Sequence, residues 1–252
     1  MRKKRGFTII EVSLFLAITG VIFVGIAVGT QNSIFWQRYN DSIQSFAEFL
    51  RTVYSQVNSV QSDGTGNSDE AMYGRLVVFG ANDESNKNVI TSYTVFGNAN
   101  ASSTAGGILA QLGPVENGGV GAKIKTDKGF VASYTPRWGS QIQTIGSNIF
   151  TGALLVVRHP SSGIVYTLYS SGGGLAAGGS AIDIGSFSVV SGDGIDFCVN
   201  PNGAGESDLR KDVRIVAGAR NSSGIVVEPD SENKCTQSQG EVVEEDPEGT
   251  EG

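Results

Sequence analysis

The stretch RKKRGFTIIEVSLFLAITGVIFVGIAV, residues 2–28, decides the fold of this chain. It opens with four consecutive basic residues and continues, from Val12 to Val28, as an apolar run that only small residues interrupt. A run of about twenty such residues can cross the hydrocarbon core of a membrane. Basic residues before a spanning segment stay on the cytoplasmic side, so we expect the C-terminal part of the chain on the opposite side.

Glu11 is a lone carboxylate at the head of this apolar run. A carboxylate within hydrocarbon is costly and usually has a charged or polar partner. Glu11 is therefore predicted to be functional. An ordinary signal peptide or signal anchor is the alternative, with its small-residue cleavage site near Ala27. That alternative explains neither Glu11 nor the Gly6-Phe7 pair.

The order Gly6-Phe7 followed by TIIE, residues 8–11, after a short basic leader resembles the processing site of type IV pilins and pseudopilins. The resemblance implies that a membrane aspartyl prepilin peptidase cuts between Gly6 and Phe7 and methylates the new amine of Phe7. It also implies that Glu11 pairs with that amine on a neighbouring subunit when a filament forms. A charged group is tolerated in an apolar core only when it is paired with an opposite charge and hydrogen-bonded.

The resemblance also implies partners and a location. The partners are other pilin subunits in a helical filament, the prepilin peptidase, and an assembly platform protein with its ATPase. Before assembly the chain is a single-pass protein of the inner membrane, with its N terminus in the cytoplasm. After assembly it is part of an extracellular filament.

One long helix is predicted after the leader, because no proline occurs before Pro114 and no strong helix breaker occurs up to about Val60. Apolar residues in its second half are spaced three and four apart, which predicts a stripe on one face. The stripe consists of Trp36, Tyr39, Ile43, Phe46, Leu50, Val53, Val57 and Val60. We expect this stripe to pack on a sheet, and a coiled coil is the alternative.

The rest of the chain is rich in glycine, serine and β-branched residues, which predicts short strands joined by tight turns. The expected strands are 75–80, 89–96, 123–126, 130–135, 141–146, 153–158, 164–169, 187–191, 195–199, 213–217 and 225–228. Residues 159–163 and 220–224 are predicted hairpin loops. The fold class is therefore α+β, with the long helix packed on an antiparallel β-rich domain. The pattern after residue 195 is similar to GspH/FimT-like minor pseudopilins.

These patterns divide the chain into four parts. Residues 1–6 are the leader, and residues 7–62 are the long helix, which spans the membrane over 8–29 and is amphipathic over 30–62. Residues 63–236 form the β-rich domain. Residues 237–252 are acidic with few large apolar side chains, which is typical of a disordered tail.

Cys198 and Cys235 lie in the part expected outside the cytoplasm, where disulfides persist, so we expect them to bond to each other. Two free thiols are the alternative. No metal or other cofactor is expected. Calcium would find oxygen ligands in two acidic turns, although such turns are commoner than calcium sites. The candidate ligands are Asp63, Asn67, Asp69 and Glu70 in one turn and Asp193, Asp196 and Asn200 in the other.

The chain is not expected to be an enzyme, since its single histidine, His159, lies in a hairpin loop and is expected to be exposed. A net charge of −7 disfavours binding to nucleic acid. We expect Lys123, Lys125 and Lys128 to be solvated lysines on an edge strand, and contact with DNA or an acidic surface is the alternative.

The expected function is structural: a subunit, minor rather than major, of a filament for adhesion, motility, secretion or DNA uptake. A major pilin and a tip adhesin with a ligand-binding domain are the alternatives. Trp138, with Arg137 and Tyr134 nearby, is the one aromatic cluster that suits an adhesin. A buried tryptophan that caps a sheet is expected instead, and the exposure of Trp138 distinguishes the two.

Overall fold

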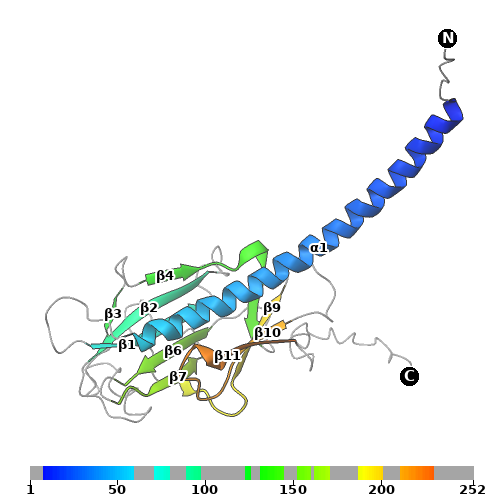
Figure 1. Ribbon diagram of the computed structural model, residues 1–252. Helices are drawn as coiled ribbons and strands as arrows, with labels where there is room; N and C mark the ends of the chain where they lie inside the picture. Colours follow the sequence, from blue (N-terminus) through cyan, green and yellow to red (C-terminus); the bar gives the residue numbers. More distant parts are fainter. Residues whose placement is uncertain are drawn as a thin grey trace, which may run out of the picture. The chain divides into compact units, whose positions relative to one another are not determined.

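The computed structural model describes residues 8–59, 71–79, 89–97, 123–125, 131–144, 152–159, 162–170, 187–200 and 211–229. These residues form two compact units, Met1–Asp41 and Ser42–Gly252, and one helix contributes to both. The elements, labelled in Figure 1 where space allows, are α1 (Ile9–Asn58), β1 (Ala71–Phe79), β2 (Ile90–Gly97), β3 (Lys123–Lys125), β4 (Val131–Tyr134), η3 (Arg137–Gly139), β5 (Gln141–Thr144), β6 (Gly152–Arg158), β7 (Val165–Ser170), β8 (Ser188–Val189), β9 (Ile195–Asn200), β10 (Lys211–Ile215), η6 (Ser222–Gly224) and β11 (Ile225–Pro229).

The first unit is the N-terminal part of α1. Its large apolar side chains from Ile9 to Ile26 are exposed to solvent, and Phe15, for example, is 69% exposed. The helix is long and apolar enough to cross a membrane. Exposure of this kind on the isolated chain is what a segment covered by lipid or by other helices should show.

The second unit contains two antiparallel sheets. The larger has seven strands in the order β3-β2-β1-β6-β7-β8, and β4 also pairs with β2. The smaller has the order β11-β10-β9-β5. Every strand pair is antiparallel, including the predicted hairpins β6–β7 and β10–β11. The α+β class with antiparallel sheets is therefore confirmed.

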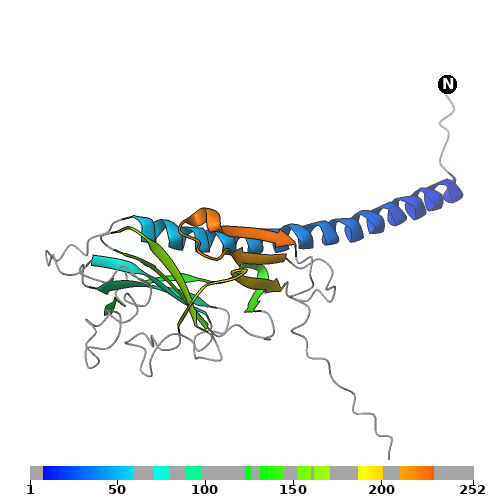
Figure 2. The same cartoon turned by 90° about the horizontal axis from the view of Figure 1, so that it is seen from below.

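The C-terminal part of α1 packs on both sheets, as Figure 2 shows from below. Phe46 is fully buried, and its ring centroid lies 6.5 Å from that of Phe79 on β1 and 5.7 Å from that of Phe197 on β9. Phe79 and Phe197 stack at 5.3 Å. One helical side chain thus joins the two sheets, and the expected packing of the helix on a sheet is confirmed.

Polar contacts add to this packing. The hydroxyls of Tyr54 on α1 and Thr167 on β7 are hydrogen-bonded at 2.6 Å, and the Thr167 hydroxyl donates to the Ala219 carbonyl at 3.3 Å. Burial raises the pKa of Tyr54 to about 12. The Arg51 guanidinium donates to the Ile225 carbonyl of β11 at 3.3 Å. The helix is therefore hydrogen-bonded to strands of both sheets.

Successive residues of a strand point to opposite faces, so the face of the large sheet turned away from Phe46 carries the residues that alternate with Phe79. That face is an apolar cluster: Leu76, Val78, Val95, Ala153, Leu155, Val157, Leu168 and Phe187. Gly74 lies at a bulge in β1, where an added Cβ would lie 1.9 Å from the Val156 carbonyl oxygen. Only glycine allows β1 and β6 to approach so closely.

The prediction that His159 is exposed is wrong. It is 2% exposed, and its Nδ1 atom lies 3.0 Å from the backbone nitrogen of Ser162, which donates to it, and 2.9 Å from the Ser162 hydroxyl. Its own backbone nitrogen donates to the Ile164 carbonyl at 2.8 Å. The imidazole therefore turns inward and closes the β6–β7 hairpin.

Candidate functional site

The first turn of α1 is built around Thr8 and Glu11. The Glu11 backbone nitrogen donates to the Thr8 carbonyl at 3.1 Å and to the Thr8 hydroxyl at 3.3 Å. Thr8 therefore caps the helix, and Glu11 stands three residues later, in the first turn, where a negative charge interacts favourably with the helix dipole. The threonine directly before the apolar run was the sequence signal for this cap, which was not predicted.

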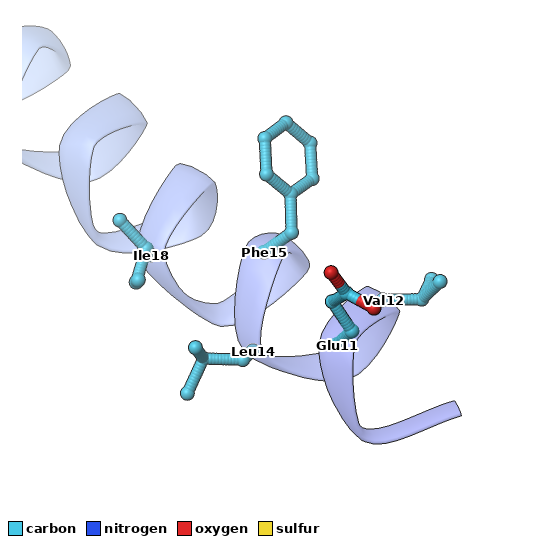
Figure 3. A pocket seen from close by; sticks show the side chains of 5 residues that line it. All are labelled: Glu11, Val12, Leu14, Phe15 and Ile18. Atoms are coloured by element: carbon cyan, nitrogen blue, oxygen red, sulfur yellow. The ribbon is translucent and has the colours of Figure 1, made fainter. Parts of the chain in front are cut away.

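Glu11 also belongs to an apolar surface. Figure 3 shows its carboxylate beside Val12 and Phe15, with Leu14 and Ile18 following along the helix. These five residues line one shallow pocket on the helix. Glu11 is the only charged residue from Ile9 to Gln37. The arrangement is a single negative charge in a surface that is otherwise suited to lipid or to another apolar helix.

No ion pair of Glu11 occurs among residues 8–59 and the other described segments. The carboxylate is thus available to a cation. Gly6 and Phe7, the predicted cleavage and methylation site, lie outside the described residues.

Comparison with protein families gives a match at the N terminus. A model described as the prokaryotic N-terminal methylation motif matches residues 1–27. This motif supports a type IV pilin or pseudopilin. No curated protein and no solved structure matches the chain. The motif points to a structural subunit and not to an enzyme. The finer likeness to GspH/FimT-like pseudopilins stays a prediction.

Most residues of the predicted apolar stripe on α1 are buried. Ile43, Phe46, Leu50, Val53 and Val57 are each at most 4% exposed within the second unit. In the first unit, Trp36 is half-buried and Tyr39 is buried, and their rings make an edge contact at 5.9 Å. Val60 lies outside the described residues. Tyr54 and Ala47 are buried as well and were not predicted.

Cys198 is buried in β9 and is not a free thiol. Cys235 lies outside the described residues, so the pairing of the two cysteines stays a prediction.

At the predicted calcium site near β9, the carboxylate of Asp196 already binds an arginine. Arg214 donates from Nε to Asp196 Oδ1 at 2.5 Å and from Nη2 to Oδ2 at 3.2 Å, so both oxygens of that carboxylate bind a guanidinium. Asp193 is exposed. Across the described segments no group of three or more His, Cys, Asp or Glu residues could hold a metal ion. The other predicted turn, Asp63 to Glu70, lies outside them.

Asp196 belongs to an acidic cluster on the small sheet. Arg214 lies 3.2 Å from Glu228 Oε2 and 3.8 Å from Asp212 Oδ2, so one guanidinium faces three carboxylates. Burial, and then the negative charge of Asp196, raise the pKa of Asp212 to about 6. The hydrogen bond with Asp196 raises the pKa of Arg214.

Two further predicted residues lie at edges. Lys123 and Lys125 lie on β3, which is an edge strand of the large sheet, as expected for edge-strand lysines. Lys128 lies outside the described residues.

The prediction that Trp138 is buried is wrong. The side chain is 55% exposed, and its backbone has a φ of 59°. Tyr134 turns away from it and stacks on Phe49 at a centroid distance of 4.9 Å. The aromatic cluster that an adhesin would need is therefore not exposed as a cluster, whereas Trp138 itself is.

Proposed function

We propose that this protein is a structural subunit of a type IV pilus or pilus-like filament. The observation that carries the proposal is the single charge, Glu11, in the first turn of an exposed apolar helix whose sequence matches the methylation motif. A helix of this kind needs an apolar environment on all sides, and in a filament the neighbouring helices supply it.

Processing would prepare the other half of a charge pair. Cleavage between Gly6 and Phe7 leaves a positively charged amine one residue before the helix cap Thr8. Glu11 would bind the amine of a neighbouring subunit, because an uncompensated carboxylate in an apolar core is strongly unfavourable. The prepilin peptidase, platform protein and ATPase act on the chain while the helix holds it in the membrane with its N terminus in the cytoplasm.

Size and loop content favour a minor subunit over a major one. Residues 63–236 would be the part exposed on the filament, and a Cys198–Cys235 disulfide would stabilise it. The ratio of this chain to the most abundant subunit in sheared filaments tests whether it is a minor subunit.

A tip adhesin is the second candidate, and the exposure of Trp138 is the observation that favours it. The stacking of Tyr134 on Phe49 weakens that case. It leaves the ring of Trp138, and not two rings, to bind a ligand.

The test replaces Glu11 by Gln in the native host, with Glu48→Gln as the matched control. Glu48 is also an exposed helical glutamate, with 70% of its side chain exposed, and lies in the second unit. We expect Glu11→Gln to reach the membrane normally and to be lost from sheared filaments, and Glu48→Gln to assemble. Equal incorporation of both variants would refute the proposal.

A further inference from the structure

The hairpin loop between β10 and β11 carries the sequence Asn221-Ser222-Ser223, and all three residues are exposed. Asn-x-Ser, with any residue except proline in the middle, is the acceptor sequence for sugars that are attached to asparagine in surface loops of exported proteins. So short a sequence also occurs by chance. The conformation of the loop therefore decides whether Asn221 is suited to this chemistry.

Hydrogen bonds hold the backbone of this loop at both ends. The Gly224 backbone nitrogen donates to the Asn221 carbonyl at 3.2 Å, and the Val216 backbone nitrogen donates to the Gly224 carbonyl at 2.9 Å. The Asn58 side chain of α1 donates to the Arg220 carbonyl at 3.2 Å. Asn221 itself has an extended backbone, with φ −151° and ψ 178°. The folded protein thus presents an exposed asparagine on a fixed loop.

The two polar atoms of the Asn221 side chain have different surroundings. Oδ1 accepts from the Ser223 backbone nitrogen at 3.0 Å and from the Ser223 hydroxyl at 2.5 Å, and in this way it caps the short helix η6. Nδ2 makes no hydrogen bond with any residue that the structure describes. The cap therefore uses the oxygen and leaves the nitrogen open to solvent.

This arrangement suits a reaction at the nitrogen. An amide nitrogen is a poor nucleophile, and it becomes a better one when it loses a proton. The negative charge that develops then moves by resonance onto the amide oxygen. In Asn221 that oxygen already has two donors from Ser223, and donors placed where charge develops stabilise it as an oxyanion hole does.

A second Asn-x-Ser sequence within the described residues lacks these features. Asn40 lies inside the long helix α1, and Ser42, which would supply the hydroxyl, is fully buried. An enzyme that needs this hydroxyl has no access to it in the folded protein. A third sequence of this kind, at Asn100, lies outside the described residues. Asn40 is therefore an internal control for Asn221.

We propose that Asn221 is the acceptor of an N-linked sugar. The donor is a sugar that is activated by a diphosphate leaving group on its anomeric carbon. Nδ2 of Asn221 forms a bond to that carbon, the bond from carbon to the diphosphate oxygen breaks, and the diphosphate leaves with the electron pair. The Nδ2 proton passes to a base of the transferase. The inference uses the proposed position of this domain outside the cytoplasm and does not depend on filament assembly.

The first test is the mass of the peptide Asp212–Lys234, which cleavage after lysine releases from the full-length chain. The chain is recovered from sheared filaments and from membranes of the native host. We expect the peptide to carry at least one sugar residue, and the tryptic peptide that contains Asn40 to be unmodified. A peptide N-glycosidase in water labelled with heavy oxygen should remove the sugar and convert Asn221 to a labelled aspartate. An unmodified peptide, a sugar on a serine hydroxyl, or deamidation without a sugar would overturn the inference.

The second test addresses the hydroxyl that bonds to Asn221. Ser223→Ala removes this donor and Ser223→Thr retains one, while Ser222→Ala is the matched control at an exposed serine that the acceptor sequence does not require. We expect the sugar to be lost in Ser223→Ala and kept in the other two variants, at equal protein levels. The same loss in Ser222→Ala as in Ser223→Ala would contradict the role given to Ser223.

The outcomes separate this inference from the filament proposal. A chain that is present in filaments with an unmodified Asn221 would refute the inference and leave the filament proposal standing. A chain that carries the sugar but is absent from filaments would refute the filament proposal and leave the inference standing.

Discussion

Replacing Asp212 by Asn should make the protein more stable at neutral pH, although it removes a buried polar contact. Asp212 is 4% exposed on β10 and stands directly opposite Glu228 of β11. Like charges in that position destabilise a strand pair. Arg214 is 3.8 Å from Asp212, farther than it is from Asp196 or Glu228, and so compensates this carboxylate least.

The magnitude follows from the pKa of Asp212, which is raised from 3.8 to about 6, first by burial and then by the charge of Asp196. The folded protein therefore binds a proton more tightly than the unfolded chain does. The contribution of Asp212 to the free energy of unfolding is highest below pH 3.8, decreases as pH rises towards 6, and is lower by about 3 kcal/mol above that. Asn carries no charge, so the variant should lack this loss.

The assay is urea unfolding of the full-length protein in detergent between pH 4.5 and 8, with Asp193→Asn as a control at an exposed aspartate. Comparing each variant with the wild type at the same pH cancels every other titrating group. We expect the advantage of Asp212→Asn to grow from pH 4.5 to 7.5 and that of Asp193→Asn to stay flat. An advantage for Asp212→Asn that does not change with pH would refute the reasoning.

Three further predictions concern the second unit. Phe46→Ala should lower the free energy of unfolding by about 3–5 kcal/mol, because it leaves a cavity between the helix and both sheets, and urea unfolding measures it. Tyr54→Phe should cost about 1 kcal/mol and Thr167→Val about 1–3 kcal/mol, since only the second leaves a buried hydroxyl without its partner; the reverse order would contradict the bonding described. Cys198 and Cys235 should resist alkylation until the protein is reduced, and mass spectrometry showing labelled thiols beforehand would exclude the disulfide.

Much of the fold was predictable because each element has a local signal. Hydrophobic period and turn residues located all the strands found in the described residues. Their ends were less certain. β1 begins at Ala71 and not at residue 75, because Gly74, which looks like a turn, is a bulge inside the strand. β10 begins at Lys211, two residues before the predicted start, because Lys211 and Asp212 pair with residues of β9 and β11 and do not mark a loop.

The site was less evenly predictable. Glu11 stood out because a charge in an apolar run is rare, and the motif around it is local. The burial of Trp138 and of His159 was predicted wrongly, because it depends on backbone angles and on hydrogen bonds that close a turn. The amino-acid sequence does not indicate that Trp138 has a φ of 59° or that His159 accepts a hydrogen bond from Ser162. The Asp196–Arg214 pair depends on strand register and was likewise invisible.

The central claim is that this chain is processed and assembled as a pilin. The most direct test is the N-terminal mass of the protein recovered from sheared filaments of the native host. The account predicts a chain that begins at Phe7 with a methylated amine. An intact Met1, or a cut near Ala27 of the kind that a secretory signal undergoes, would contradict it.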